Sequence, residues 1–290
     1  MRVIDAHVHL YPPEANRDPV VWGLDKGERS WVEMCTRRRK SGLPVQDFPT
    51  VDELLLEMDT ADVERAVLLG WYWTSAETCA AQNRFYATCV QAHPDRLSAY
   101  ATFQPTAGSA ILQEELRRTQ DEGFVGVGEL SPHSQGYSVT DAVFRELLQQ
   151  AANRKWPVNL HVTDPISRDY PGRVETPLLD FVQLAGTHAE VTFILAHWGG
   201  LLPLRESSAV ELKNLFYDTA ASPLLYDVSV WARFLATVPE DKILFGSDFP
   251  LNVFPTREPK AGMTRFVSEA KLAGAGSRVL RENMLRLLER

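Results

Sequence analysis

The stretch "DAHVHL" near the start of the chain places Asp5, His7 and His9 on alternate positions of an otherwise apolar run. Because a β-strand alternates its side chains between two faces, these three polar residues share one face. Imidazole and carboxylate groups are costly to bury unless something binds them. The spacing therefore predicts a strand whose end holds a metal ion.

Further histidine and acidic residues stand at the ends of later apolar runs. They are Glu129 in "GVGEL", His161 in "VNLHV", His197 in "ILAHWGG" and Asp248 in "LFGSDFP". With the first pair they make four imidazoles and two carboxylates, the ligands that zinc and its first-row neighbours take. A single histidine on an apolar strand is usually a packed core residue, so the interpretation depends on finding all six at such ends. Asp218 in "FYDTAAS" is left with a supporting or structural role.

Eight apolar runs of β type alternate with amphipathic helical patterns along the 290 residues. The runs are "RVIDAHVHL", "RAVLLGWY", "LSAYATFQP", "FVGVGELSP", "PVNLHVT", "VTFILAHWGG", "LFYDTAAS" and "KILFGSDFP". This alternation predicts a parallel sheet with helices over it, and eight units favour a closed, if slightly distorted, (β/α)8 or TIM barrel. No GxGxxG turn follows the first run, which argues against a dinucleotide site. In a barrel the carboxyl ends of the strands converge on one mouth, where all six polar residues would meet.

Local signals refine the helices between the runs. Thr50 with Glu53, and Thr74 with Glu77, fit the capping boxes that begin helices. The segment 277–290, "SRVLRENMLRLLER", is typical of a closing helix. The three cysteines, at positions 35, 79 and 89, show no CxxC pairing, and we expect free thiols.

Residues 11–49 are too many for an ordinary connection between a strand and a helix. The segment contains Trp22, Trp31 and the basic run of residues 37–40, "RRRK". Long loops after barrel strands usually cover the active-site face, so we predict one domain, residues 1–290, in which 11–49 caps the site. The basic run is either a solvated face or a means of attracting an anionic substrate.

The composition limits the classes of partner. A formal net charge of −8 and an isoelectric point near 5.4 argue against general nucleic-acid binding. No apolar stretch is long enough to cross a membrane, and no signal-peptide pattern is present. We expect a cytoplasmic enzyme that acts on a small molecule, with a homodimer as a further expectation.

The motifs "DAHVHL", "GVGEL", "LHVT", "LAHWGG", "FGSDFPL" and "ENMLRLL" together resemble the amidohydrolase superfamily. More narrowly, the chain resembles its amidohydrolase-related branch, which includes aminocarboxymuconate semialdehyde decarboxylase, resorcylate-type decarboxylases and lactonases. The resemblance covers nearly the whole chain. It implies that His7, His9, His161 and Asp248 hold a catalytic divalent metal, commonly zinc, with manganese as another choice.

The resemblance leaves the number of metal ions open. In decarboxylase members the histidine of the sixth strand, here His197, is an acid/base group near one metal. In binuclear members a carboxylate of the fourth strand, here Glu129, bridges two ions, and His161 and His197 hold the second. Decarboxylases typically lack that carboxylate, so Glu129 favours hydrolysis.

Two catalytic hypotheses and one non-catalytic hypothesis follow. The first is hydrolysis of a small carboxylated ester, lactone or amide by a metal-activated water, with Asp248 as the base. The alternative is a mononuclear, non-oxidative decarboxylase of a small aromatic or unsaturated acid, in which His197 takes part in protonation. A metal-binding barrel without catalysis is the third, and the complete ligand set counts against it. Candidate substrate-binding residues are Trp22, Trp31, Arg37, Trp71, Arg168 and Arg173.

Overall fold

Eight parallel strands form one sheet, in the order β1 to β8, in the computed structural model, which describes residues 2–253 and 262–289. The strands are β1 (Val3–Val8), β2 (Val63–Leu69), β3 (Leu97–Ala101), β4 (Gly126–Leu130), β5 (Val158–Leu160), β6 (Phe193–Leu195), β7 (Leu215–Asp218) and β8 (Ile243–Leu244). A bridge between Val8 and Phe249 and a bond from Ala6 N–H to the Phe245 carbonyl (2.8 Å) join the two ends of the sheet. The prediction of a (β/α)8 barrel is confirmed, with strands β5, β6 and β8 shorter than the sequence runs suggested.

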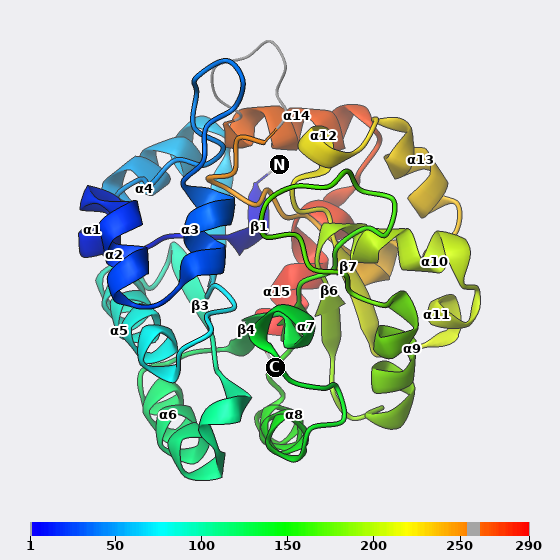
Figure 1. Ribbon diagram of the computed structural model, residues 1–290. Coiled ribbons are helices and arrows are strands. Elements are labelled where there is room, and N and C mark those ends of the chain that lie inside the picture. The colour runs from blue at the N-terminus through cyan, green and yellow to red at the C-terminus, as the bar shows by residue number, and fades with distance from the viewer. Residues whose placement is uncertain (1, 254–261, 290) are drawn as a thin grey trace.

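Helices surround the barrel and cover its strands (Figure 1). The longer ones are α4 (Val51–Thr60), α5 (Ala76–Ala92), α6 (Ser109–Asp121), α8 (Ala142–Arg154), α9 (Leu178–Thr187) and α14 (Met263–Leu272). Shorter helices are α7 (Pro132–Gln135), α10 (Leu202–Arg205), α11 (Ser208–Glu211), α12 (Ser222–Leu225) and α13 (Ser229–Leu235). The 3-10 turns are η1 (Pro105–Ala107), η2 (His197–Leu201) and η3 (Glu240–Lys242).

The C-terminal segment forms the predicted closing helix, as a π-helical turn η4 (Arg278–Glu282) followed by α15 (Asn283–Leu288). Its Met284 and Leu287 pack with buried side chains of the strands. Strand members of this cluster are Ile4, Ala6, Val67, Leu69, Tyr100, Ile194, Phe216 and Leu244. Residues from strands on both sides of the barrel thus share one apolar cluster with the last helix.

The two predicted helix starts have different outcomes. At α4 the capping box is present: Thr50 accepts from the Glu53 N–H, and the Glu53 side chain accepts from the Thr50 N–H. At α5 the prediction is wrong, because Ser75 is the cap and its hydroxyl accepts from the Glu77 N–H.

Residues 11–49 contain three short helices rather than an open loop. These are α1 (Pro13–Arg17), α2 (Pro19–Asp25) and α3 (Arg29–Cys35), which lie over one side of the barrel (Figure 1). The end of the segment pairs with the chain beyond β8, through a bridge between Gln46 and Leu251 and a bond from Asn252 N–H to the Val45 carbonyl (2.7 Å). The end of the segment therefore lies beside the chain that follows Asp248.

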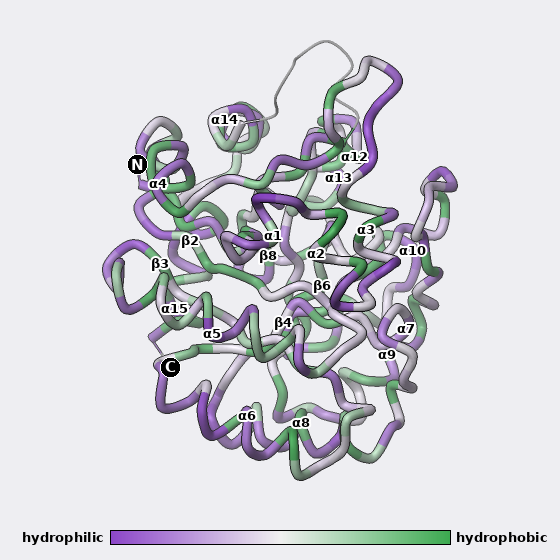
Figure 2. The backbone as a smooth tube through the Cα atoms, turned by 60° about the vertical axis from the view of Figure 1, so that its left-hand side comes forward, coloured by the Kyte–Doolittle hydropathy of each residue, from purple (hydrophilic) through white to green (hydrophobic). Residues whose placement is uncertain are grey.

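The basic run lies in a projecting turn closed by a bridge between Arg38 and Pro44. Figure 2 shows this turn as a hydrophilic stretch at the edge of the molecule. The three cysteines are free and buried, as expected. None of the helices formed by residues 2–253 and 262–289 has both the length and the apolar character needed to cross a bilayer.

Candidate metal centre

The barrel brings together all six residues predicted from the strand ends. They are His7 in β1, His9 just beyond it, Glu129 in β4, His161 directly after β5, His197 shortly after β6 and Asp248 after β8. Each side chain is buried or nearly so, and the most exposed, that of His161, is 13 % exposed. Adjacent members lie within 4 Å of one another.

Three donor atoms form a compact triangle on the β1 side of the cluster. The Nε2 atoms of His7 and His9 are 3.1 Å apart, and Oδ1 of Asp248 is 3.7 Å from the first and 3.5 Å from the second. Tetrahedral zinc with bonds of about 2.0–2.1 Å has ligand atoms about 3.3 Å apart. The triangle therefore has the dimensions of one face of a zinc coordination shell.

The hydrogen bonds of the Nδ1 atoms of His7 and His9 explain why their Nε2 atoms face each other. His7 Nδ1 is 2.9 Å from Oδ2 of Asp218, and His9 Nδ1 is 2.9 Å from the Leu69 carbonyl. Both partners accept hydrogen bonds, so each Nδ1 carries a proton and each Nε2 is free for a cation.

The pKa values of the pair follow from the same contacts. Burial disfavours a charged His7, but the carboxylates of Asp218, Glu129 and Asp248 raise its pKa to about 10. Burial and the charge of His7 lower the pKa of His9 to about 3. Without a metal ion the two Nε2 atoms therefore share one proton, which His7 donates to His9.

Glu129 lies between two groups of possible ligands. Its Oε2 is 3.7 Å from His9 Nε2, whereas its Oε1 is 3.0 Å from His161 Nδ1 and 3.9 Å from His197 Nε2. One ligand atom each from His7, His9 and Glu129 lie within 4.8 Å of one another, and the same holds for Glu129, His161 and His197. A carboxylate with one oxygen toward each group has the geometry of a bridge between two ions.

Burial and neighbouring charges shift the pKa values of Glu129, Asp248 and His197 in different directions. Burial opposes ionisation of Glu129, but His161 and its hydrogen bond bring the pKa of this carboxyl well below its usual range. Asp248 shows the opposite shift, because burial outweighs the attraction of His7 and raises its pKa well above the ordinary value. Burial and the nearby His161 lower the pKa of His197 to about 4, so its imidazole is neutral at pH 7.

Asp218, at the end of β7, is the supporting carboxylate of the site. Its Oδ2 accepts from His7 Nδ1 and from Asn159 Nδ2 (3.0 Å), and its Oδ1 accepts from the backbone N–H groups of His197 (3.1 Å) and Ala220 (3.0 Å). Burial works against its charge, but His7 and these donors lower its pKa. The role of Asp218 was left open by the sequence patterns. They also gave no sign of Asn159, although Asn159 stands two residues before His161 in the same strand pattern.

Asp5, which shares the alternation of His7 and His9, binds backbone groups. Its Oδ1 accepts from the backbone N–H groups of His7 and Ser247, both at 3.0 Å. Burial raises the pKa of Asp5 to about 6 despite these bonds. The residue ties β1 to the chain that leads to Asp248.

Two of the site residues have left-handed backbone conformations, with φ of 56° at His197 and 64° at Asp248. In η2 the left-handed conformation continues from His197 to Leu201, with two glycines at positions 199 and 200. Non-glycine residues avoid this region at a cost of about 1–2 kcal/mol each, and such strain gathers at functional sites. The strained turns direct these two side chains toward the other ligands.

Two stacked aromatic rings after β2 form one wall of the site. Trp71 and Tyr72 stack with centroids 4.3 Å apart. The Trp71 ring is 5.6 Å from that of His9, and the Tyr72 ring is 4.9 Å from that of His161. Sequence reasoning named Trp71 but missed Tyr72, whose only signal was its place directly beyond a strand.

The contacts of three other predicted substrate-binding residues are with residues outside the six. Trp22 and Trp31 pack against each other with centroids 5.6 Å apart, in an aromatic cluster that also contains Trp71 and Tyr72. Arg168 is exposed, and Arg173 bonds within its own loop, to Oγ of Ser167 (3.1 Å).

Arg37 joins the segment 11–49 to the loop that follows β5. Its guanidinium lies 5.5 Å from the ring centroid of Tyr170, in the loop after β5. Its Nε is buried and has no hydrogen-bond partner among residues 2–253 and 262–289.

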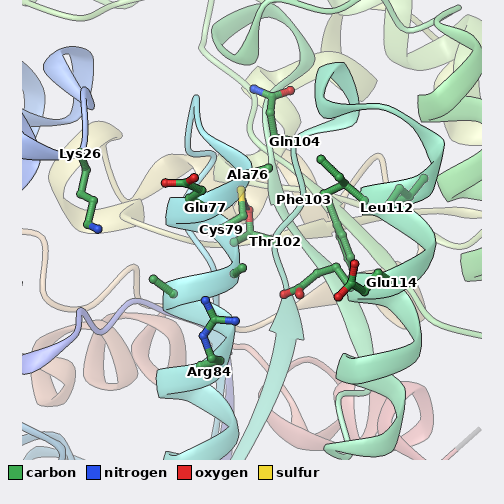
Figure 3. A pocket seen from close by; sticks show the side chains of 14 residues that line it. Lys26, Ala76, Glu77, Cys79, Arg84, Thr102, Phe103, Gln104, Leu112 and Glu114 are labelled. Carbon is green, nitrogen blue, oxygen red and sulfur yellow. Dashed lines mark hydrogen bonds between the residues drawn. The ribbon is translucent and has the colours of Figure 1, made fainter.

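A groove with about 500 Å³ of space lies outside the barrel, between α5 and α6 (Figure 3). Its lining includes Cys79, Thr102 and Phe103 on the floor and Lys26 and Glu77 on the rim. None of the six clustered residues lines it. The groove is thus separate from the candidate metal centre.

Comparisons with known proteins agree with this architecture. The family model described as amidohydrolase matches residues 4–289. No curated protein matches the chain.

Solved structures share the fold at low sequence identity. A 5-carboxyvanillate decarboxylase from Sphingomonas paucimobilis has a TM-score of 0.74 at 15 % identity, with 99 % of both chains covered. A dihydroxybenzoic acid decarboxylase from Polaromonas, with bound manganese and an inhibitor, has a TM-score of 0.69 at 17 % identity, covering 99 % of this chain and 97 % of that one. A probable 2-pyrone-4,6-dicarboxylic acid hydrolase from Acinetobacter baumannii has a TM-score of 0.67 at 17 % identity, with 100 % of both covered.

Proposed function

The chain belongs to the amidohydrolase family, and we propose that it is a metal-dependent hydrolase that opens a small carboxylated ester, lactone or amide. The predicted resemblance to this superfamily is thereby confirmed, and its members include both hydrolases and decarboxylases. The choice of hydrolysis depends on the position of Glu129 between two groups of ligands.

The donor atoms fit a divalent cation, because the Nε2 atoms of His7 and His9 face each other at 3.1 Å with both Nδ1 atoms engaged elsewhere. Zinc and manganese both accept this mixture of imidazole and carboxylate ligands. When bound, such an ion lowers the pKa of water and polarises a carbonyl group. We assign His7, His9 and Asp248 to one ion, and His161 and His197 to a second, with Glu129 between them.

Asp248 is the proposed general base. Its Oδ1 faces His7 and His9, whereas its Oδ2 is 3.8 Å from Nδ1 of His197. A carboxylate in this position can take a proton from the attacking water and return it to the leaving group. The neutral imidazole of His197 lies beside it, and because its Nδ1 faces the Ala220 carbonyl (3.2 Å), its Nε2 is free to hold an ion.

The covering segments supply the proposed substrate contacts. Arg37 offers a guanidinium to a carboxylate, which it can bind through two hydrogen bonds. Trp71 and Tyr72 offer aromatic faces next to His9 and His161. These groups favour a small substrate with one apolar face and one negative charge.

The experiment that tests the proposal combines metal analysis with a panel of lactones, esters and aromatic carboxylic acids. A hydrolase with two ions opens a lactone, releases no carbon dioxide, and loses one ion per chain in Glu129→Gln. Carbon dioxide release without ring opening would overturn the assignment.

The alternative is a mononuclear decarboxylase, and one observation favours it. Glu129 Oε1 and His161 Nδ1 lie at hydrogen-bond distance (3.0 Å), so these two side chains can satisfy each other without a second ion. His197 would then serve as the proton donor to carbon. One ion per chain in both the wild-type protein and Glu129→Gln, together with carbon dioxide release, would establish this reaction.

A further inference from the structure

We propose that Gln82 and Tyr86, two buried residues of α5, are positioning residues that hold His9 and Trp71 in register at the metal centre. The inference rests on the metal centre proposed above, but not on which reaction it performs. Both side chains are completely buried. They stand four residues apart, and therefore on the same face of the helix.

Gln82 uses all four of its hydrogen-bonding positions. Its Oε1 accepts from the Trp71 backbone N–H (2.8 Å) and from Nε1 of Trp73 (2.5 Å). Its Nε2 donates to the Leu10 carbonyl (2.9 Å) and to the Tyr86 hydroxyl (3.2 Å). An amide has two donors and an acceptor oxygen with two lone pairs, so no alternative orientation satisfies these partners.

The direction of the Tyr86 hydroxyl follows from its four contacts. The oxygen accepts from the Leu10 N–H (3.1 Å) and from Gln82 Nε2, which leaves its single proton to donate. The carbonyls of Leu10 (3.0 Å) and Leu69 (2.8 Å) are within reach, each receives one other bond, and the shorter distance is to Leu69. The hydroxyl therefore donates to Leu69.

The Leu69 carbonyl is the link to the metal centre. It accepts from the Tyr86 hydroxyl and from Nδ1 of His9 (2.9 Å), one bond for each lone pair. The first bond fixes the carbonyl, and the second fixes the tautomer of His9 and the direction of its Nε2. Partners of this kind behind a metal-binding histidine typically change metal affinity by about 10–100-fold.

The same pair of side chains joins the ends of two strands. Gln82 binds Leu10 beyond β1 and Trp71 beyond β2, so it sets the distance between the chain that carries His9 and the aromatic wall. A polar network with every member satisfied is rigid and specifies one arrangement. The pair also satisfies the backbone groups of Leu10 and Trp71, which an apolar pair would leave without these partners.

The test measures zinc affinity by competition with a fluorescent chelator in the metal-free protein and in Tyr86→Phe. The substitution removes only the hydroxyl, and we expect zinc binding to weaken at least tenfold. The matched control is Tyr217→Phe, because Tyr217 is also buried and its hydroxyl has no hydrogen-bond partner in the part of the chain that the structure describes. This control leaves zinc affinity at the wild-type value.

Gln82→Met gives a second, independent variant that removes the amide bonds and keeps the side-chain length. It weakens zinc binding like Tyr86→Phe. It also shifts KM, because Trp71 is no longer held. If either variant folds, with wild-type far-UV circular dichroism, and binds zinc with wild-type affinity, the positioning role is contradicted. If the wild-type protein itself binds no zinc or manganese, the metal centre fails instead, and the two failures are distinct.

Discussion

The Nε2 atoms of His7 and His9 face each other at 3.1 Å, although both Nδ1 atoms already donate to acceptors. Two imidazole lone pairs at this distance require a positive charge between them. In the metal-free protein that charge is the proton held by His7, whose pKa is raised to about 10. A divalent cation must displace this proton to bind.

The displaced proton predicts a pH dependence of metal affinity. Zinc needs an unprotonated Nε2, and His7 is protonated below pH 10, so zinc binding releases a proton at neutral pH. Apparent affinity should rise about tenfold per pH unit between pH 7 and 9. Calorimetry in buffers with different heats of ionisation measures the release. Affinity that does not change with pH would contradict the shared proton.

Asp218→Asn should weaken zinc binding by about 10–100-fold. The carboxylate accepts hydrogen bonds from four donors, and an amide turns its NH2 group toward some of them. Chelator competition measures the effect. The control is Asp180→Asn, because Asp180 pairs with His133 (2.9 Å) outside the metal centre and should leave zinc affinity unchanged. Equal affinity in both variants would show that Asp218 does not support His7.

Asp248→Asn should keep the fold and lose several orders of magnitude in kcat, because an amide cannot take the proton of the attacking water. Steady-state kinetics and circular dichroism test the two parts separately. A variant with kcat within a few-fold of the wild type removes Asp248 from the role of base.

Gly246→Ala should displace His7. A Cβ atom at position 246 would lie 2.8 Å from the Cβ of His7, which is closer than such atoms approach in proteins. We expect weaker zinc binding and a lower Tm. Gly186→Ala in α9 is the matched control: its Cβ meets nothing within 4 Å, and alanine suits a helix better by about 1 kcal/mol. A Gly246→Ala protein that matches this control in zinc affinity would contradict the tight fit behind His7.

The barrel and the six clustered residues could be predicted because both depend on local patterns. Alternating apolar runs define the strands, and the carboxyl ends of parallel strands meet at one mouth, so His161 and Asp248 were assigned to the same place as His7. The start of α5 was wrong for a tertiary reason. Buried Glu28, in the segment 11–49, accepts from the N–H groups of Thr74 (2.9 Å) and Ser75 (3.0 Å). These bonds hold Thr74 in place, and the next residue, Ser75, caps the helix instead.

The support behind the site could not be predicted, because its residues are distant in sequence and carry no pattern of their own. Gln82 and Tyr86 look like ordinary members of an amphipathic helix until the fold places them against Leu10 and Leu69. The role of Asp218 likewise depends on the approach of β7 to His7, which no spacing in the sequence reports.

Whether His7 and His9 hold a divalent cation is tested most directly by the metal-to-chain ratio. The protein is stripped with a chelator, incubated with zinc, desalted and analysed for metal, beside a His7→Ala/His9→Ala variant of confirmed fold. We expect at least one ion per chain in the wild-type protein and the loss of at least one in the variant. A wild-type protein that keeps no stoichiometric zinc or manganese, or a variant that keeps as much as the wild type, would contradict it.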